Sequence, residues 1–186
     1  MDISGLFTKV KKYSEDNKYL PIKVESVESL RYVIGLLANR SNNTLKAFIK
    51  FDHNGNNTFF DAFTHLEVKK NLKDFLSEDD TSISIVTNCT NKFSRLSEGL
   101  EINSSDKLFL YEFPQEKLEA MEAKLSQPMH SFILGDKQSL MIGHFDFNND
   151  KKHTFVNFSD SESAKKMLSF FNKAKSLSPR AGENKK

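Results

Sequence analysis

Apolar residues recur at the spacing of amphipathic helices in several stretches of the chain. Ser26 is a typical N-cap residue, Thr64 and Glu67 have the spacing of a capping box, and Pro114 suits the first turn of a helix. The predicted helices cover residues 3–13, the stretch from Ser26 to residues 39–42, the stretches after Thr64 and after Pro114, and residues 160–175. The residues expected on the inner faces of the last three are Val68, Leu72, Phe75 and Leu76; Leu118, Met121 and Leu125; and Ala164, Met167, Leu168 and Phe171.

Shorter stretches alternate between apolar and polar residues, as half-buried strands do. The predicted strands cover residues 20–24, 45–51, 58–63, 82–86, 107–112, 131–134, 139–147 and 153–158. Asn54-Gly55 is a strong hairpin signal, so residues 45–51 and 58–63 are expected to pair. The pattern predicts an α+β fold with an antiparallel or mixed β-sheet and helices packed on one side.

Residues 47–76 resemble residues 141–171, and the Phe-Asp-x-Asn motif at 51–54 recurs at 145–148. Each copy is interpreted as a hairpin followed by a helix. A strand and a helix precede the hairpin in both copies. The chain is therefore interpreted as two similar β-α-β-β-α units, with a chance match between common residues as the alternative. The predicted organisation is a first α+β unit at 1–104, a second at 105–175 packed against it, and a disordered tail at 176–186.

The same alternation indicates which ends of the strands are wetter. Lys50 and Asp52 share one face of their strand, and His144 and Asp146 share the corresponding face in the second copy. We interpret these polar ends as an interaction surface, and an ordinary half-solvated sheet is the alternative. The candidate residues are Lys50, Asp52, His53, Asn54, His144 and Asp146.

The composition is that of a folded protein without a strong overall charge. Among 186 residues, 38% are apolar and 28% are charged, and the 17 Phe residues predict a packed core. The 27 Lys and Arg residues against 25 Asp and Glu residues leave a net charge of +2. Nucleic acid is therefore not expected as a partner, because there is no overall basic field to hold it.

The longest nearly unbroken apolar run, residues 32–38, is far short of the roughly 20 residues that a membrane span needs. The first residues carry charges where a signal peptide has its apolar stretch. We therefore expect a cytoplasmic protein without a membrane span, and secretion by a route that needs no signal peptide stays open.

Residue types that carry catalysis or bind metals lack a recognisable spacing. The five histidines form no His-Glu-x-x-His pattern, although His144 and His153 are expected to face each other, as a surface pair or a weak metal pair. Cys89 is alone, and no glycine-rich loop follows a strand. We predict no metal, no cofactor and no dense catalytic set, while dispersed histidines and carboxylates leave a small hydrolase open.

Several motifs resemble the N-terminal domain of the SseB (enhanced serine sensitivity) family over about residues 19–121. They are Tyr19-Leu20-Pro21-Ile22, Phe51-Asp52-x-x-Gly55, Ala62-Phe63-Thr64-x-Leu66, the run from Leu100 to Ser105, and the run from Phe113 to Leu118. The chain departs from the family at Ser104, where the usual residue is Pro. The resemblance implies an α+β fold and a bacterial cytoplasmic or secretion-related setting, and it implies no catalytic residues.

The absence of a catalytic motif and the repeated hairpin and helix favour a non-enzymatic protein-protein interaction module. An adaptor, an inhibitor of the immunity type or a secretion-associated protein fits this description. Its partner would be another protein, and a homo-oligomer is a further expectation. The alternatives are a small hydrolase with a dispersed His and carboxylate site, or a weak nucleic-acid binder.

Overall fold

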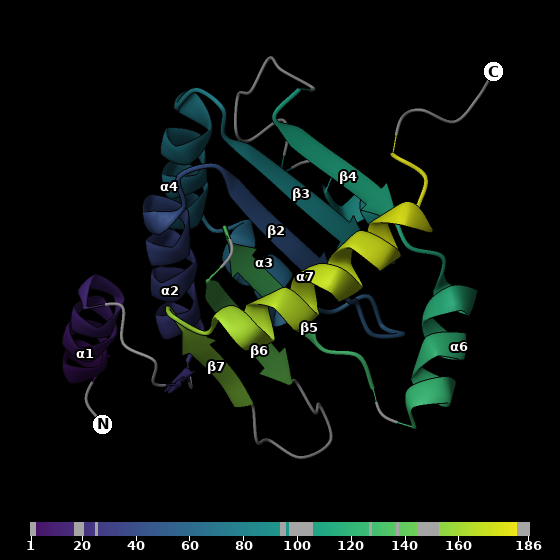
Figure 1. The fold of residues 1–186 in the computed structure, drawn as a ribbon, viewed down its shortest axis with the longest axis horizontal. Helices are drawn as coiled ribbons and strands as arrows, with labels where there is room; N and C mark the ends of the chain where they lie inside the picture. The colour runs from purple at the N-terminus through teal and green to yellow at the C-terminus, as the bar shows by residue number, and fades with distance from the viewer. Residues whose placement is uncertain are drawn as a thin grey trace.

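The computed structural model describes residues 3–16, 21–24, 26–93, 96, 106–126, 128–136, 138–144 and 153–181 (Figure 1). The helical elements are α1 (Ile3–Glu15), α2 (Val27–Arg40), α3 (Thr58–Phe63), α4 (Leu66–Ser77), the 3₁₀ turn η1 (Thr90–Phe93), α6 (Gln115–Leu125) and α7 (Ser161–Ser176). The strands are β1 (Ile22–Val24), β2 (Thr44–Ile49), β3 (Ser82–Thr87), β4 (Leu108–Glu112), β5 (Ser131–Gly135), β6 (Ser139–His144) and β7 (His153–Asn157).

All seven strands belong to one mixed sheet in the order β1-β7-β6-β5-β2-β3-β4. β2, β3 and β4 run parallel to one another. The pairs β2–β5, β5–β6, β6–β7 and β7–β1 are all antiparallel. The predicted α+β class with a mixed sheet is therefore confirmed. Strands from either side of the expected boundary at residues 104 and 105 pair within this sheet, since β1 joins β7 and β4 joins β3.

Helices cover both faces of the sheet rather than one. Figure 1 shows α7 lying across one face, while α1, α2 and α4 stand together at its side. Ala47 and Ile49 of β2 belong to the apolar cluster that also holds the inner residues of α2, α3 and α4. Phe48 between them belongs to a second cluster, with Leu118 of α6 and Phe171 of α7. Because helices cover both faces, four of the six residues of β2 and five of the six residues of β3 are buried, including Ser84 and Thr87 of β3.

The face of β2 that was predicted to be wetter is interrupted by Phe48, which is buried between Lys46 and Lys50. Phe48 is 1% exposed, and its ring stacks on Phe132 at 5.7 Å and meets the edge of Phe170 at 5.1 Å. Lys46 and Lys50, on either side of Phe48 along this face, are partly buried, and Lys50 keeps about a fifth of its side chain exposed. Leu125, expected to face inward, is half exposed at the last turn of α6.

The prediction of a strand at residues 58–63 is wrong, because these residues form α3. Asn57 caps the helix by accepting a hydrogen bond from the Phe60 N–H at 2.9 Å. Both edges of β2 are already paired, with β3 and β5, so no place is left for a hairpin partner. The first half of the proposed repeat is therefore not a hairpin, whereas the second half does contain the β6–β7 hairpin followed by α7.

Thr64 closes α3 instead of starting α4. Its hydroxyl donates to the Phe60 carbonyl at 3.0 Å, and α4 has His65 at its N-cap without a side-chain hydrogen bond. The predicted capping box is therefore not formed. The inner face predicted for this helix is confirmed, since Val68, Leu72, Phe75 and Leu76 are buried.

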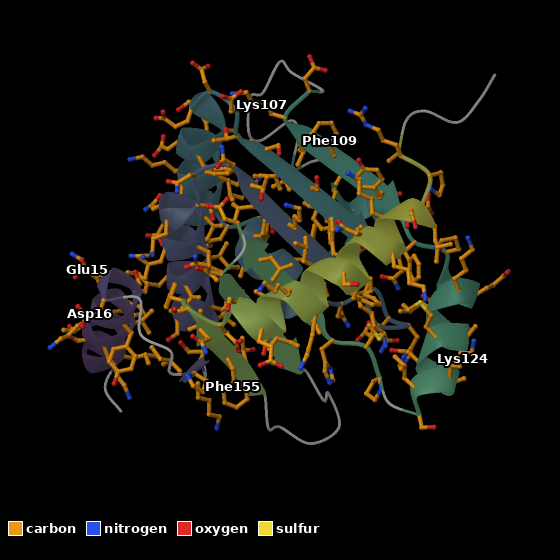
Figure 2. The ribbon with its side chains drawn as sticks, in the orientation of Figure 1. Glu15, Asp16, Lys107, Phe109, Lys124 and Phe155 are labelled. Atoms are coloured by element: carbon orange, nitrogen blue, oxygen red, sulfur yellow. The ribbon has the colours of Figure 1, made fainter. Side chains whose placement is uncertain are left out.

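Lys107 fixes the C-terminal end of α4 to the start of β4 (Figure 2). Its ammonium group donates to the carbonyl groups of Leu76 at 3.0 Å and Glu78 at 2.6 Å. A cation at this end also complements the helix dipole. This contact joins the last turn of the helix to the sheet.

Residues 177–181, which belong to the predicted tail, follow α7 and pair with β4. Glu112 donates its N–H to the Pro179 carbonyl at 3.1 Å, and Ala181 donates to the Leu110 carbonyl at 2.8 Å. The guanidinium of Arg180 lies over the ring of Phe109, which is labelled in Figure 2. The segment therefore covers the outer edge of β4, the last strand of the sheet.

We expect a chain that ends at Ser178 to self-associate, because it leaves the backbone N–H and C=O groups of β4 unpaired at an open sheet edge. Light scattering coupled to size exclusion should show a species larger than the full chain. A chain that ends at Ala181 keeps the paired segment and is the matched control, with the mass of the full chain. Equal masses for both truncations would contradict the role of this segment.

We expect Gly143→Ala to lower the free energy of unfolding by about 1–3 kcal/mol. A Cβ atom at this position of β6 would overlap the ring of Phe59 and approach the Thr154 hydroxyl. Gly5→Ala in α1 is the control, because no atom lies within 4 Å of the added methyl group. Urea denaturation of the two variants measures the difference, and equal stabilities would show that the ring of Phe59 moves aside without cost.

Candidate functional site

A cavity of about 350 Å³ opens where β2 ends and β5 begins, and we call it the His130 cavity. Its ionisable lining residues are Lys50, Asp52, His53, Glu119, Glu122 and His130. β2 and β5, whose ends meet here, are central strands of the sheet. The cavity therefore has a rigid floor and polar walls, the combination expected of a ligand site.

The pairing of β2 with β5 brings Lys50 and His130 together. Phe48 and Phe132 are the last pair of this ladder, and Lys50 and His130, two residues beyond them, both line the cavity. The Lys50 N–H donates to the Ser131 hydroxyl at 3.1 Å, which holds the two strand ends in this relation.

Asn57 is the buried connection behind the cavity. Its amide donates to the Lys50 carbonyl at 2.6 Å and to the Ser131 hydroxyl at 2.9 Å, while its oxygen caps α3. One side chain thus joins the end of β2, the start of β5 and the first turn of α3. Asn57 is 5% exposed, so losing these partners would leave buried groups unsatisfied.

The turn after β2 presents His53 at the rim. One oxygen of the Asp52 carboxylate accepts from the N–H groups of Asn54 at 2.9 Å and Asn56 at 2.8 Å. Gly55 takes a left-handed conformation with φ of 75°, which the tight turn requires. The turn is therefore built around the Asp52 carboxylate, and His53 lies exposed beside it.

Two glutamates of α6 supply the facing wall. Glu122 forms an ion pair with Lys50 and also accepts the Met129 N–H at 2.6 Å. Glu119 accepts a hydrogen bond from the Gln115 amide at 2.8 Å. Glu122 thus connects α6 both to the end of β2 and to the segment that leads into His130.

The cavity has more negative than positive charge. Asp52, Glu119 and Glu122 contribute three carboxylates against the single ammonium group of Lys50, a balance of −2 before the imidazoles are counted. Within the described ranges, no group of three or more His, Cys, Asp or Glu side chains is arranged to hold a metal ion. The imidazoles and carboxylates of the cavity are groups that can transfer protons, and its one ammonium group is paired with Glu122.

Two further cavities carry less chemistry. One, at the opposite end of β2, is lined by Asp136, whose carboxylate is already taken up by the N–H groups of Asn42, Asn43 and Thr44. The other lies between α1, α2 and α4 and includes Tyr32. The pKa of Tyr32 is raised above its usual value, mainly by burial and to a smaller extent by the negative charge of Glu15. The ring of Tyr32 stacks on the ring of Phe7, with 4.3 Å between the ring centroids. These contacts explain Tyr32 as a packing residue of α2.

The structure brings together part of the predicted site. Lys50, Asp52 and His53 line the cavity, and Asn54 lies exposed in the adjoining turn. His144 ends β6 and pairs with His153 of β7, which confirms the expected facing of these two positions in the hairpin. Asp146 lies outside the described residues.

Sequence analysis missed His130, Asn57, Glu119 and Glu122. The two glutamates are three residues apart on a predicted helix, which places them on one face. His130 stands directly before an apolar strand, as Lys50 stands near the end of another. These signals were present, but only the sheet order joins them.

We expect Asn57→Ala to lower the free energy of unfolding by about 1–3 kcal/mol. The change removes the cap of α3 and leaves the Lys50 carbonyl and the Ser131 hydroxyl without this partner. Asn56 is the exposed neighbour of Asn57 in the chain, and the free energy of unfolding of Asn56→Ala should stay within about 0.5 kcal/mol of the wild type. Thermal unfolding of the pair tests this, and equal losses would contradict the role given to Asn57.

Neither a family model nor a curated protein sequence matches the chain, so the resemblance to the SseB family stays a prediction. Solved structures with the same fold do match. TrmBL2, an archaeal chromatin protein whose structure shows a mode of DNA binding, is 8% identical with a TM-score of 0.57. The alignment covers 95% of this chain and 60% of TrmBL2.

Two enzymes share the fold as well. The phospholipase D family member Nuc from Salmonella typhimurium is 12% identical, with a TM-score of 0.56 over 87% of this chain and 98% of Nuc. Phosphatidylserine synthase from Haemophilus influenzae is 8% identical, with a TM-score of 0.52 over 90% of this chain and 40% of that enzyme. At these identities the shared property is the fold.

These neighbours correct the preference for a non-enzymatic protein-interaction module. The same fold occurs in a phospholipase D family member and in phosphatidylserine synthase, so the fold gives no preference to an interaction module. In the part of the chain that the structure describes, no helix is both long and apolar enough to cross a bilayer.

Proposed function

We propose that this protein hydrolyses phosphodiesters in the His130 cavity. The observation that carries the proposal is that His130, His53 and Lys50 line the same cavity. An imidazole can transfer protons, and an ammonium group can balance charge on a phosphoryl oxygen. The cavity therefore contains the groups that hydrolysis of a phosphate ester needs.

The neighbours support a phosphodiester as the substrate class. A phospholipase D family member and phosphatidylserine synthase carry names that refer to phospholipids, and TrmBL2 is described as binding DNA. Phospholipids and DNA both contain phosphodiesters, in which one phosphate is esterified to two alcohol groups. A phosphodiester carries one negative charge, so the three carboxylates of the cavity repel it less than they repel a doubly charged phosphate ester.

In the proposed reaction, the imidazole of His130 accepts a proton from a water molecule that attacks phosphorus. The new P–O bond forms as the bond to the leaving oxygen breaks, and the protonated imidazole of His53 supplies the proton that this oxygen needs. Lys50 lies where it can stabilise the negative charge that builds on a non-bridging oxygen. The products are a phosphomonoester and an alcohol.

We expect the wild-type chain to release 4-nitrophenol from bis(4-nitrophenyl) phosphate, and His130→Ala to reduce that rate by about 10²–10⁴-fold. His65→Gln, which changes a histidine outside the cavity, is the control and should keep the wild-type rate. The assay follows absorbance on purified protein with matched thermal stability. A wild-type rate equal to the buffer rate, or a His130→Ala rate equal to the wild type, would contradict the proposal.

A second function, nucleic-acid binding without turnover, draws on the likeness to TrmBL2. The three carboxylates of the His130 cavity oppose a polyanion there, so any such binding would use another surface. Fluorescence anisotropy with a DNA duplex at increasing salt would detect it, because phosphate contacts weaken steeply with ionic strength. Binding that His130→Ala leaves unchanged, without hydrolysis, would favour this function over the first.

A further inference from the structure

Glu122 is placed to control the charge of the ligand that Lys50 accepts. Its carboxylate pairs with the Lys50 ammonium group, and both side chains are about four-fifths buried. Lys50 is the one Lys or Arg among the described residues that line the cavity, so a bound anion has to share this ammonium group with Glu122.

A second contact fixes the glutamate in this place. The same carboxylate oxygen accepts the Met129 N–H at 2.6 Å, and Met129 directly precedes His130. Glu122 therefore cannot leave Lys50 without also releasing the segment that positions His130. A ligand with two negative charges meets a carboxylate that is held in place and does not swing away.

We propose that Glu122 is a specificity-determining residue that admits singly charged phosphodiesters and excludes doubly charged phosphomonoesters. The inference rests on the proposed function for the choice of phosphate esters as ligands. Each added negative charge on the ligand is repelled by Glu122, by Glu119 on the same helix and by Asp52 in the turn after β2, all of which line the cavity. The same repulsion favours release of the product, because hydrolysis converts a singly charged phosphodiester into a doubly charged phosphomonoester.

Glu122→Gln separates the charge of this residue from its structural contact. The amide oxygen of glutamine can still accept the Met129 N–H, so the approach to His130 is kept while one negative charge is lost. Glu122→Ala loses both. Glu116→Gln makes the same change in net charge at an exposed position on α6, outside the cavity, and is the matched control.

The test measures binding and not turnover, so that it does not depend on catalysis. Dissociation constants for diphenyl phosphate, a monoanion, and phenyl phosphate, a dianion at pH 8, are determined by isothermal titration calorimetry. The wild type and Glu116→Gln should bind the diester at least about ten-fold more tightly than the monoester. Glu122→Gln should tighten monoester binding about ten-fold and change diester binding less than about three-fold.

An unchanged ratio of the two constants in Glu122→Gln would overturn the inference, as would an absence of binding of both esters to the wild type. If the role of Glu122 were purely structural, Glu122→Gln would weaken the binding of both ligands to the same extent. It would also lower the melting temperature as much as Glu122→Ala does. Charge selection by a protein that fails to hydrolyse bis(4-nitrophenyl) phosphate would uphold the role of Glu122 and refute the proposed function alone.

Discussion

The antiparallel pairing of β2 with β5 is the constraint on which the rest of the site depends. On its other side β2 pairs in parallel with β3, so this strand is where the parallel and antiparallel halves of the sheet meet. A change of direction at this point brings the end of one strand beside the beginning of the other. Lys50 and His130 line one cavity for that reason, and the hydrogen bonds of Asn57 to the Lys50 carbonyl and the Ser131 hydroxyl join the two strand ends.

Burial of both sheet faces determines where polar chemistry is possible. The rings of Phe48 and Phe132 fill the space under α7, and Ile49 packs toward α2 and α4 on the other face. A charged group at these positions would be buried without a partner, at a high cost in free energy. The strand ends are free of this restriction, which is why the ionisable groups gather there.

Local patterns were sufficient for most elements and failed where the sheet order decides the outcome. Helical periodicity and the Ser26 cap predicted α2, and the capping serine does accept the Ser29 N–H. Residues 58–63 combine β-favouring aromatic residues with the Asn54-Gly55 turn signal, so a strand was the natural reading. Whether such a segment pairs depends on free edges at β2, and both edges are filled by strands that come later in the chain.

The candidate site shows the same limit more sharply. Lys50, Asp52 and His53 are close in sequence and were predicted as a polar strand end. Glu122 is 72 residues from Lys50, and Ser131 is 81 residues away, so no local pattern reveals that they touch. The individual signals are weak because an exposed-looking glutamate or histidine is common on any helix or strand end. They acquire meaning only when the sheet brings an acid, a base and a cation to one cavity, where the field of each changes what the others can bind.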